Sequence, residues 1–189
     1  MGSNLIGKAL LVIDMLNDFV HGSLKVPAAK DIIPNIKRLI DVFRSRKLPV
    51  IYVNDDHIRN VDLELRLWGQ HAITGTWGSK VIDELEPQEG DFIISKRRYS
   101  GFFATDLDLL LRELNVKSLV LTGVVTDICV LHTAADAFFR GYEVIVVSDA
   151  TASLTHDRHE RALSYMKEVY GAKILSTTEV ENMLLRPQP

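Results

Sequence analysis

The sequence predicts an α/β fold: a single domain built on a doubly wound, mostly parallel sheet of about six strands with helices on both faces. Short apolar runs rich in Val and Ile alternate with longer runs of helical spacing along the 189 residues. Strands that are apolar throughout are typical of parallel sheets buried between two helical layers. Because no repeat or linker interrupts the alternation, we expect residues 1–189 to form one domain.

Each expected element follows from its local pattern. The expected strands are residues 9–13, 49–53, 91–95, 118–122, 143–147 and 173–175. The expected helices are residues 32–47, 105–114, 127–140 and 158–170, and the last two are followed by Gly141 and Gly171, where helix-ending glycines are common. Apolar stripes mark the buried faces of the first two helices: Ile36, Leu39, Ile40 and Phe43 in one, and Leu107, Leu110, Leu111 and Leu114 in the other.

Residues 55–90 break this alternation with a long polar stretch of weak periodicity. A long irregular excursion in a compact domain is usually functional, so we expect it to contribute to a site.

Composition excludes several classes of protein. Hydrophobic residues make up 47% and charged residues 25% of the chain, with a net charge of −3, so no basic patch indicates a nucleic-acid partner. No apolar run reaches the length of a membrane span, and Met1–Asn4 does not resemble a signal peptide. A single cysteine excludes an intramolecular disulfide and fits a reducing compartment, so we expect a cytoplasmic protein.

That cysteine, Cys129, lies where a nucleophile would be built. The apolar run 118–122 ends at Gly123, a short turn follows, and a helical pattern begins. Ligands of open parallel sheets bind beyond the carboxyl ends of the strands, and the positive end of a helix dipole favours a thiolate. The alternative is a buried structural cysteine.

Two charged residues are expected on the same rim. Asp14 closes the first strand, where its carboxylate could take the proton of a thiol, although a loop carboxylate could equally cap the turn. Lys96 follows the third strand, where its ammonium would stabilise a thiolate and keep Asp14 ionised. The neighbouring Arg97 and Arg98 are interpreted as solvated surface.

The irregular excursion offers a possible metal site. Asp55 and His57 form an Asp-x-His pair compact enough to give two ligands to one cation, and Glu64 and His71 follow. Imidazole and carboxylate ligands suit Zn, Fe, Mn or Ni. Asp56 could replace Asp55 as the ligand, and all of these residues could instead be solvated loop positions.

Aromatic residues near these positions could form pocket walls. Phe19, Trp68 and Tyr99 are the candidates, with ordinary core packing as the alternative. His132 follows Cys129 by three residues, and we expect its ring to pack against the sheet rather than to pair with the thiol.

Together these residues carry a resemblance. Asp14, Lys96 and the segment 123–129 (GVVTDIC) have the order and spacing of the isochorismatase-like cysteine hydrolases, a superfamily that includes nicotinamidases and N-carbamoylsarcosine amidases. Residues 99–102 (YSGF) and 134–137 (AADA) resemble the same family, and the resemblance runs from about residue 9 to about residue 150.

The resemblance implies roles for the residues on the rim. Asp14 is the general base, Cys129 the nucleophile, and Lys96 the charge partner of a catalytic triad. A cis peptide bond between Val124 and Val125 is implied, which would place the N–H groups of Val125 and Cys129 as an oxyanion hole.

It also implies a metal and a substrate. Nicotinamidases hold a divalent metal, often zinc, and their ligands match Asp55, His57 and His71, with Glu64 used in some members. The metal would bind the ring nitrogen of nicotinamide and orient its amide. Iron, manganese or nickel could take the place of zinc.

The expected function is therefore hydrolysis of a small carboxamide, with nicotinamide as the first choice of substrate, through a Cys129 thioester. Residues 58–60 (IRN) replace a Pro-containing segment of nicotinamidases, and Tyr99 follows Lys96 after a short loop, which resembles the N-carbamoylsarcosine amidases as much. N-carbamoylsarcosine-type and ureidoacrylate-type hydrolysis are the alternatives. A non-catalytic small-ligand binder is a second alternative, although an intact triad argues against it. We also expect a homo-oligomer, either a dimer or a tetramer.

Overall fold

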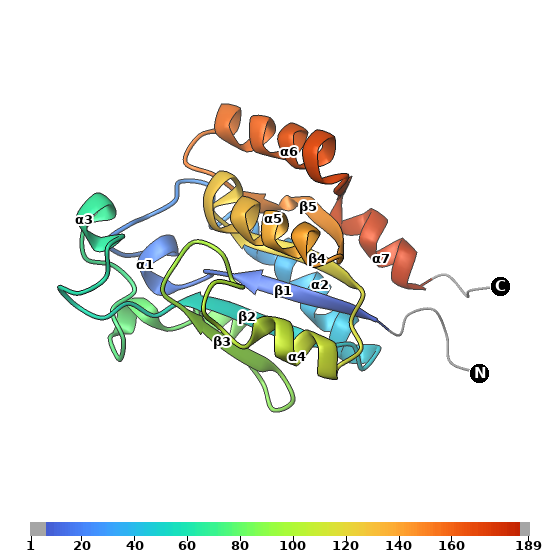
Figure 1. Ribbon diagram of the computed structural model, residues 1–189, viewed down its shortest axis with the longest axis horizontal. Coiled ribbons are helices and arrows are strands. Elements are labelled where there is room, and N and C mark those ends of the chain that lie inside the picture. Colours follow the sequence, from blue (N-terminus) through green and yellow to red (C-terminus); the bar gives the residue numbers. More distant parts are fainter. Residues whose placement is uncertain (1–6, 186–189) are drawn as a thin grey trace.

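The computed structural model describes residues 7–185, so Met1–Asn4 lie outside it, and its centre is one parallel sheet (Figure 1). Its strand order is β3-β2-β1-β4-β5-β6, and every neighbouring pair is parallel. The strands are β1 Lys8–Ile13, β2 Val50–Asp55, β3 Phe92–Lys96, β4 Ser118–Val124, β5 Glu143–Ala152 and β6 Lys173–Leu175. The predicted α/β class and six strands are confirmed, with the sheet parallel throughout rather than mostly parallel.

Helices cover both faces of this sheet. Within residues 7–185 the α-helices are α1 Asn17–Val20, α2 Ile33–Ser45, α3 Leu65–Trp68, α4 Leu107–Glu113, α5 Leu131–Phe139, α6 His156–Tyr170 and α7 Thr177–Leu185. One apolar layer packs α2 and α7 against the sheet, and the other packs α4, α5 and α6 on the opposite face. No helix in this part of the chain is long and apolar enough to cross a membrane.

The periodic patterns predicted the helical faces well. The four stripe residues of α2 are all buried, and in α4 Leu107 and Leu111 are buried with Leu110 and Leu114 packed beside them. Gly171 ends α6 in the left-handed region at φ 63°, and Gly141 follows α5 at φ 80°. Glycine adopts this conformation without the clash that a Cβ causes.

Strand ends run further than predicted. β2 includes Asp55 and β3 includes Lys96, so both charged residues are the last residues of their strands rather than the first of the following loops. They also face each other across the ladder, because Asp55 pairs with Lys96 in the register of β2 and β3.

The start of the helix after β4 also differs from the prediction. Residues Thr126–Val130 form a turn of π-helix, and α5 follows it. The small side chains of Thr133, Ala134 and Ala137 face the sheet, whereas His132 is exposed. The expectation that His132 packs against the sheet is therefore wrong, because α5 packs closely against the sheet through its small residues.

The strand order reverses direction between β1 and β4, and ligands of open α/β sheets bind outside the carboxyl ends of the strands at such a point. Gly123 lies beside the end of β1 at φ 101°, and a Cβ there would be 1.9 Å from the carbonyl oxygen of Ile13. Only glycine permits this close approach. This close approach brings the residues that follow β1 and those that follow β4 to the same rim of the sheet.

Candidate active site

Asp14 is the first polar side chain on this rim. It follows β1 directly, is fully buried, and takes a positive φ of 53°, which Asp tolerates better than most residues. Its Oδ1 accepts a hydrogen bond from the N–H of Asp55 at 2.7 Å. This bond fixes the carboxylate inside the protein, at the carboxyl end of β1.

Lys96 reaches the same point from β3 and joins two carboxylates. Its Nζ lies 2.9 Å from Asp14 Oδ2 and 2.5 Å from Asp55 Oδ1, and the side chain is buried. The two buried carboxylates raise the pKa of Lys96 well above its ordinary value, which outweighs the opposing effect of burial. Lys96 is therefore a fixed cation between Asp14 and Asp55.

Cys129 completes the group from the π-helical turn after β4. Its Sγ lies 3.6 Å from Lys96 Nζ, and its sulfur and carboxylate oxygens of Asp14 and Asp55 all lie within 4.8 Å of one another. Burial raises the pKa of the Cys129 thiol well above its ordinary value, despite the nearby ammonium. Burial thus opposes the thiolate that a position at the start of a helix is expected to favour.

The two carboxylates next to Lys96 differ in their affinity for a proton. Burial, followed by the charge of Asp55, raises the pKa of Asp14 to about 6. Burial also acts on Asp55, but Lys96 and His57 stabilise its charged form and lower the pKa of Asp55 to about 2. Asp14 is thus the carboxylate that exchanges a proton more readily at physiological pH.

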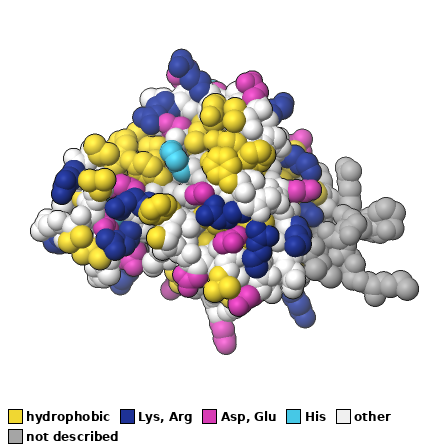
Figure 2. Space-filling model, viewed as in Figure 1, with side chains coloured by type: hydrophobic (Ala, Val, Ile, Leu, Met, Phe, Trp, Pro, Cys, Tyr) yellow, Lys and Arg dark blue, Asp and Glu magenta, His cyan; other side chains and the backbone are white. Residues whose placement is uncertain are grey.

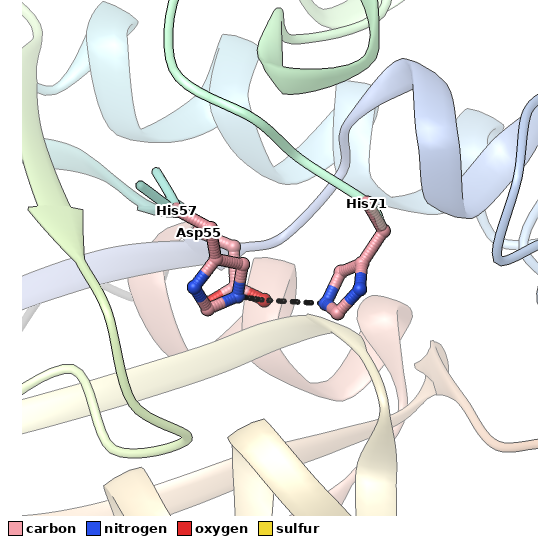
Figure 3. A group of neighbouring side chains, drawn as sticks. All are labelled: Asp55, His57 and His71. Carbon is pink, nitrogen blue, oxygen red and sulfur yellow. Dashed lines mark ion pairs between the residues drawn. The ribbon is translucent and has the colours of Figure 1, made fainter. Parts of the chain in front are cut away.

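A second cluster adjoins this group and shares Asp55 with it. Figure 3 shows the side chains of Asp55, His57 and His71 directed toward one another. Asp55 Oδ2 lies 3.5 Å from His57 Nε2 and 3.9 Å from His71 Nε2. Glu64 lies at the edge of this cluster, and its Oε2 is 3.9 Å from His57 Nε2. The structure thus brings together all four predicted metal ligands.

Backbone pairing explains how the irregular excursion places these side chains. The N–H of His57 donates to Ala72 O at 2.9 Å, and the N–H of Thr74 donates to His57 O at 3.0 Å. This parallel bridge holds His57 beside His71, their ring centroids being 4.9 Å apart. The Asp18 carboxylate accepts from the N–H of Ala72 at 2.9 Å and secures the same segment.

The donor set fits a divalent cation. The Nδ1 atom of each histidine has a hydrogen-bond partner outside the cluster. His71 Nδ1 lies 2.8 Å from Gly69 O, and His57 Nδ1 lies 3.1 Å from Asp62 Oδ2. Their Nε2 atoms therefore face inward, and His57 Nε2 and Glu64 Oε1 are buried with no hydrogen-bond partner among the described residues. Two imidazole nitrogens with carboxylate oxygens suit zinc and similar metals. Asp55, rather than Asp56, is the carboxylate of this cluster.

Asp14, Asp55 and Cys129 also form a group of metal-binding side chains by distance alone. Lys96 Nζ lies among them, at 2.9 Å from Asp14 and 3.6 Å from Cys129. Because the ammonium already supplies positive charge to this group, the group with the two histidines is the one that could hold a divalent cation.

Asp62 is a site residue that the sequence did not reveal. It is 2% exposed, and it contacts His57 and the guanidinium of Arg97. Arg97 is exposed, as predicted for solvated surface, but its guanidinium also pairs with the buried Asp62, which the sequence did not indicate. The contact joins residues 35 positions apart, so no local motif could have found it.

A small pocket is lined by Cys129 and by three of the predicted metal ligands, Asp55, Glu64 and His71. The three aromatic residues predicted as walls all line it, together with Leu24, Val26, Ile128 and Leu154. Trp68 Nε1 donates to Tyr99 Oη at 3.0 Å, which ties two of these rings together. Among the described residues that line this pocket none is Arg or Lys, and Asp55, Glu64 and His71 are its charged or titratable members besides Cys129 and Tyr99.

A wider groove of about 430 Å³ adjoins the pocket and shares Glu64 and Tyr99 with it. Its walls include Arg98, His132 and the exposed rings of Phe103 and Phe139. Figure 2 shows hydrophobic side chains gathered on the face of the molecule that carries α5 and α6. The groove therefore forms an apolar approach to the inner pocket.

The fold and the buried Asp–Lys–Cys group define an α/β protein with a small-molecule site at the carboxyl edge of its sheet. The chain matches the isochorismatase domain over residues 8–179, and it belongs to the isochorismatase family. The peptide bond between Val124 and Val125 is cis, as the resemblance implies.

Three solved structures are similar over nearly the whole chain. N-carbamoylsarcosine amidase from Thermoplasma acidophilum is 44% identical, with a TM-score of 0.85, and the match covers 90% of this chain and 96% of that one. Nicotinamidase PncA from Bacillus subtilis is 37% identical, with a TM-score of 0.85 and coverage of 89% and 99%. Pyrazinamidase of Pyrococcus horikoshii in complex with zinc is 35% identical, with a TM-score of 0.83 and coverage of 89% and 98%. These relatives act on different amides, so similarity alone does not select a substrate.

Proposed function

We propose that this protein is a cysteine amidohydrolase that converts nicotinamide to nicotinate and ammonia. The observation that carries the proposal is the buried group at the pocket floor, in which Lys96 Nζ contacts both Asp14 and the Cys129 sulfur. A proton acceptor, a nucleophile and a fixed cation within contact of one another are what thioester chemistry requires. The amidase relatives support the same reaction class.

The proposed reaction proceeds in two halves. Asp14 takes the proton of Cys129, and the thiolate attacks the amide carbonyl carbon. The N–H groups of Val125 and Cys129 stabilise the oxyanion, a contribution typically worth about 3–4 kcal/mol. Protonated Asp14 then gives its proton to the leaving ammonia. A water molecule, activated by Asp14, hydrolyses the thioester and restores the thiol.

Lys96 has an electrostatic role in both halves. During attack the proton moves from Cys129 to Asp14, so negative charge moves from the carboxylate to the sulfur. The ammonium contacts both ends of this transfer, at 2.9 Å from Asp14 Oδ2 and 3.6 Å from Cys129 Sγ. It therefore compensates the charge in either position without moving.

Asp55, His57 and His71, with Glu64 beside them, would hold a divalent metal, with zinc as the first choice and Fe, Mn or Ni as alternatives. When bound, this metal would accept the ring nitrogen of nicotinamide and so orient the amide toward Cys129, an effect of proximity that can contribute several kcal/mol. Phe19, Trp68 and Tyr99 would enclose the ring.

The lining of the inner pocket favours nicotinamide over the alternatives. N-carbamoylsarcosine and ureidoacrylate each carry a carboxylate, which needs a cationic partner when it is buried. The described residues that line the inner pocket include no Arg or Lys, and Arg98 lies in the outer groove, so a carboxylate there would have only the proposed metal as a partner. An uncharged aromatic amide fits these walls without such a partner.

Ammonia release from a panel of three amides tests this proposal. Metal-loaded protein is expected to hydrolyse nicotinamide at least tenfold faster, by kcat/KM, than N-carbamoylsarcosine or ureidoacrylate, since about 1.4 kcal/mol of differential binding gives that ratio. Removing the metal with a chelator, or introducing His71→Ala, is expected to abolish the preference by raising KM for nicotinamide, because the ring loses its anchor. Metal content measured alongside activity links the two effects.

A different ranking would redirect the assignment. Faster release from N-carbamoylsarcosine, unchanged by the chelator, would replace nicotinamidase by an N-carbamoyl amidase with Asp55 and His57 as substrate contacts. No release from any of the three, with intact ligand binding, would favour the non-catalytic binder.

We also propose that the protein is a homo-oligomer, a dimer or a tetramer. Phe138, Phe139, Tyr165 and Tyr170 form a connected aromatic cluster on α5 and α6, and Phe139 is 70% exposed. Exposed apolar clusters of this kind mark interaction surfaces. Light scattering is expected to give the mass of a dimer or tetramer for the wild type and a smaller mass for Phe139→Glu. A wild-type monomer at micromolar concentration would contradict this.

A further inference from the structure

Asp62 is a buried carboxylate that contacts His57 but is not itself one of the predicted metal ligands. Its Oδ2 lies 3.1 Å from His57 Nδ1, within hydrogen-bond distance, and accepts from the N–H of Ile58 at 2.9 Å. The guanidinium of Arg97 donates to its Oδ1 through both Nε and Nη2. The carboxylate side chain is fully buried, whereas that of Arg97 is 48% exposed. Each acceptor atom of Asp62 therefore has a partner.

Asp62 is the anion of an ion pair with Arg97, whose guanidinium contacts it through Nε and Nη2. An ionised carboxylate only accepts hydrogen bonds, so the contact with His57 requires a proton on Nδ1. A neutral His57 ring then carries its lone pair on Nε2, the atom that faces Asp55 and Glu64.

His57 Nε2 has no hydrogen-bond partner among the described residues and is buried. A buried nitrogen left without a partner costs free energy unless a ligand takes it up. The loop of Asp62 holds the ring in this orientation from the side opposite Asp55, so the two carboxylates act on different nitrogens of the same imidazole.

We infer that Asp62, held by Arg97, is the positioning residue for His57 as a metal ligand: it fixes the tautomer and orientation of the ring. This inference deepens the proposed function, since it rests on the metal cluster proposed above. Asp62 would touch neither substrate nor metal, and it would act through the imidazole.

Zinc binding to the purified protein tests the inference, measured by competition with a chromophoric chelator. Asp62→Asn is expected to weaken zinc binding about 10- to 100-fold, the usual range for loss of a partner behind a metal-binding histidine. Arg97→Gln is expected to weaken it by less, since the carboxylate remains, and Arg97→Lys is expected to recover part of that loss. Asp56→Asn changes the same charge at a nearby position outside the cluster, and it is expected to leave zinc affinity within about twofold of the wild type.

A second readout uses the metal-free protein. Long-range ¹⁵N NMR spectra at alkaline pH, where the ring is neutral, are expected to show His57 protonated at Nδ1 in the wild type and a mixture of tautomers in Asp62→Asn. Asp62→Asn with a lowered melting temperature but unchanged zinc affinity and tautomer would overturn the inference and leave Asp62 a structural residue. If the wild type binds no zinc, the metal part of the proposed function fails, and the tautomer spectrum alone decides the role of Asp62.

Discussion

Replacing Cys129 with alanine is expected to abolish amide hydrolysis, with kcat reduced about 10⁴-fold or more. Cys129 is the only cysteine in the chain, so no second thiol can form the thioester. The fold should persist, because the substitution removes one sulfur atom from an apolar cluster that includes Val130 and Ala134. Such a loss costs about 1–2 kcal/mol. Ammonia release and the thermal unfolding transition measure the two effects separately.

Two further measurements distinguish a nucleophile from a buried structural cysteine. Intact mass spectrometry of the wild type, quenched during turnover, is expected to show an acyl adduct that Cys129→Ala lacks. Nicotinamide is expected to slow alkylation of Cys129 by iodoacetamide, since both occupy the same small pocket. If Cys129→Ala keeps more than about one hundredth of the wild-type activity, the covalent mechanism is wrong, because a nucleophile cannot be dispensed with.

The parts of the fold that are periodic could be predicted from the sequence. The apolar stripe of α2 and the glycines after α5 and α6 are local signals. The structure buries that stripe and has both glycines at positive φ after their helices. Strand ends were less accurate, because Asp55 and Lys96 are polar residues whose burial depends on pairing with each other across the sheet. Helix α7 was missed, since its weaker pattern buries only three residues, Thr177, Val180 and Leu184.

The site shows the same division between local and distant signals. The motif after β4 and the Asp-x-His pair could be found because their residues are close in sequence. The contact between Asp62 and Arg97 could not be found in the sequence. A carboxylate in a loop and an arginine in a basic run are each expected to be solvated, and only the folded structure shows that they pair. The start of the helix that carries Cys129 is visible in the sequence, whereas the burial that raises the pKa of its thiol is not.

The buried charges around Lys96 affect both the stability of the fold and the proposed reaction. Asp14 and Asp55 are both buried, and a single buried cation, Lys96, contacts both of them. An unpaired buried carboxylate is unfavourable by several kcal/mol, so Lys96 supports the fold as well as the proposed reaction. Any test of its catalytic role must therefore separate stability from turnover.

Lys96→Met provides that test, because it keeps the length of the side chain and removes its charge. The variant is expected to lose about 3–5 kcal/mol of unfolding free energy, since two buried carboxylates are left facing each other. The pKa of Asp14, already raised to about 6, is expected to rise further, because the ammonium that opposes its protonation is gone. A protonated Asp14 cannot accept the thiol proton, so activity is expected to fall at least about 10²-fold at neutral pH.

The double variant Asp14→Asn with Lys96→Met separates the two roles of Lys96. It removes one negative and one positive charge, so the net charge of the buried group returns to that of the wild type, and denaturant unfolding is expected to show much of the lost stability restored. Activity is expected to stay lost, because the amide introduced at position 14 cannot accept the thiol proton as a carboxylate does. A folded Lys96→Met with activity within about tenfold of the wild type would show that the ammonium only stabilises the fold. In that case Cys129 and Asp14 would have to transfer the proton without a fixed cation beside them, and the charge-balance argument for this site would be wrong.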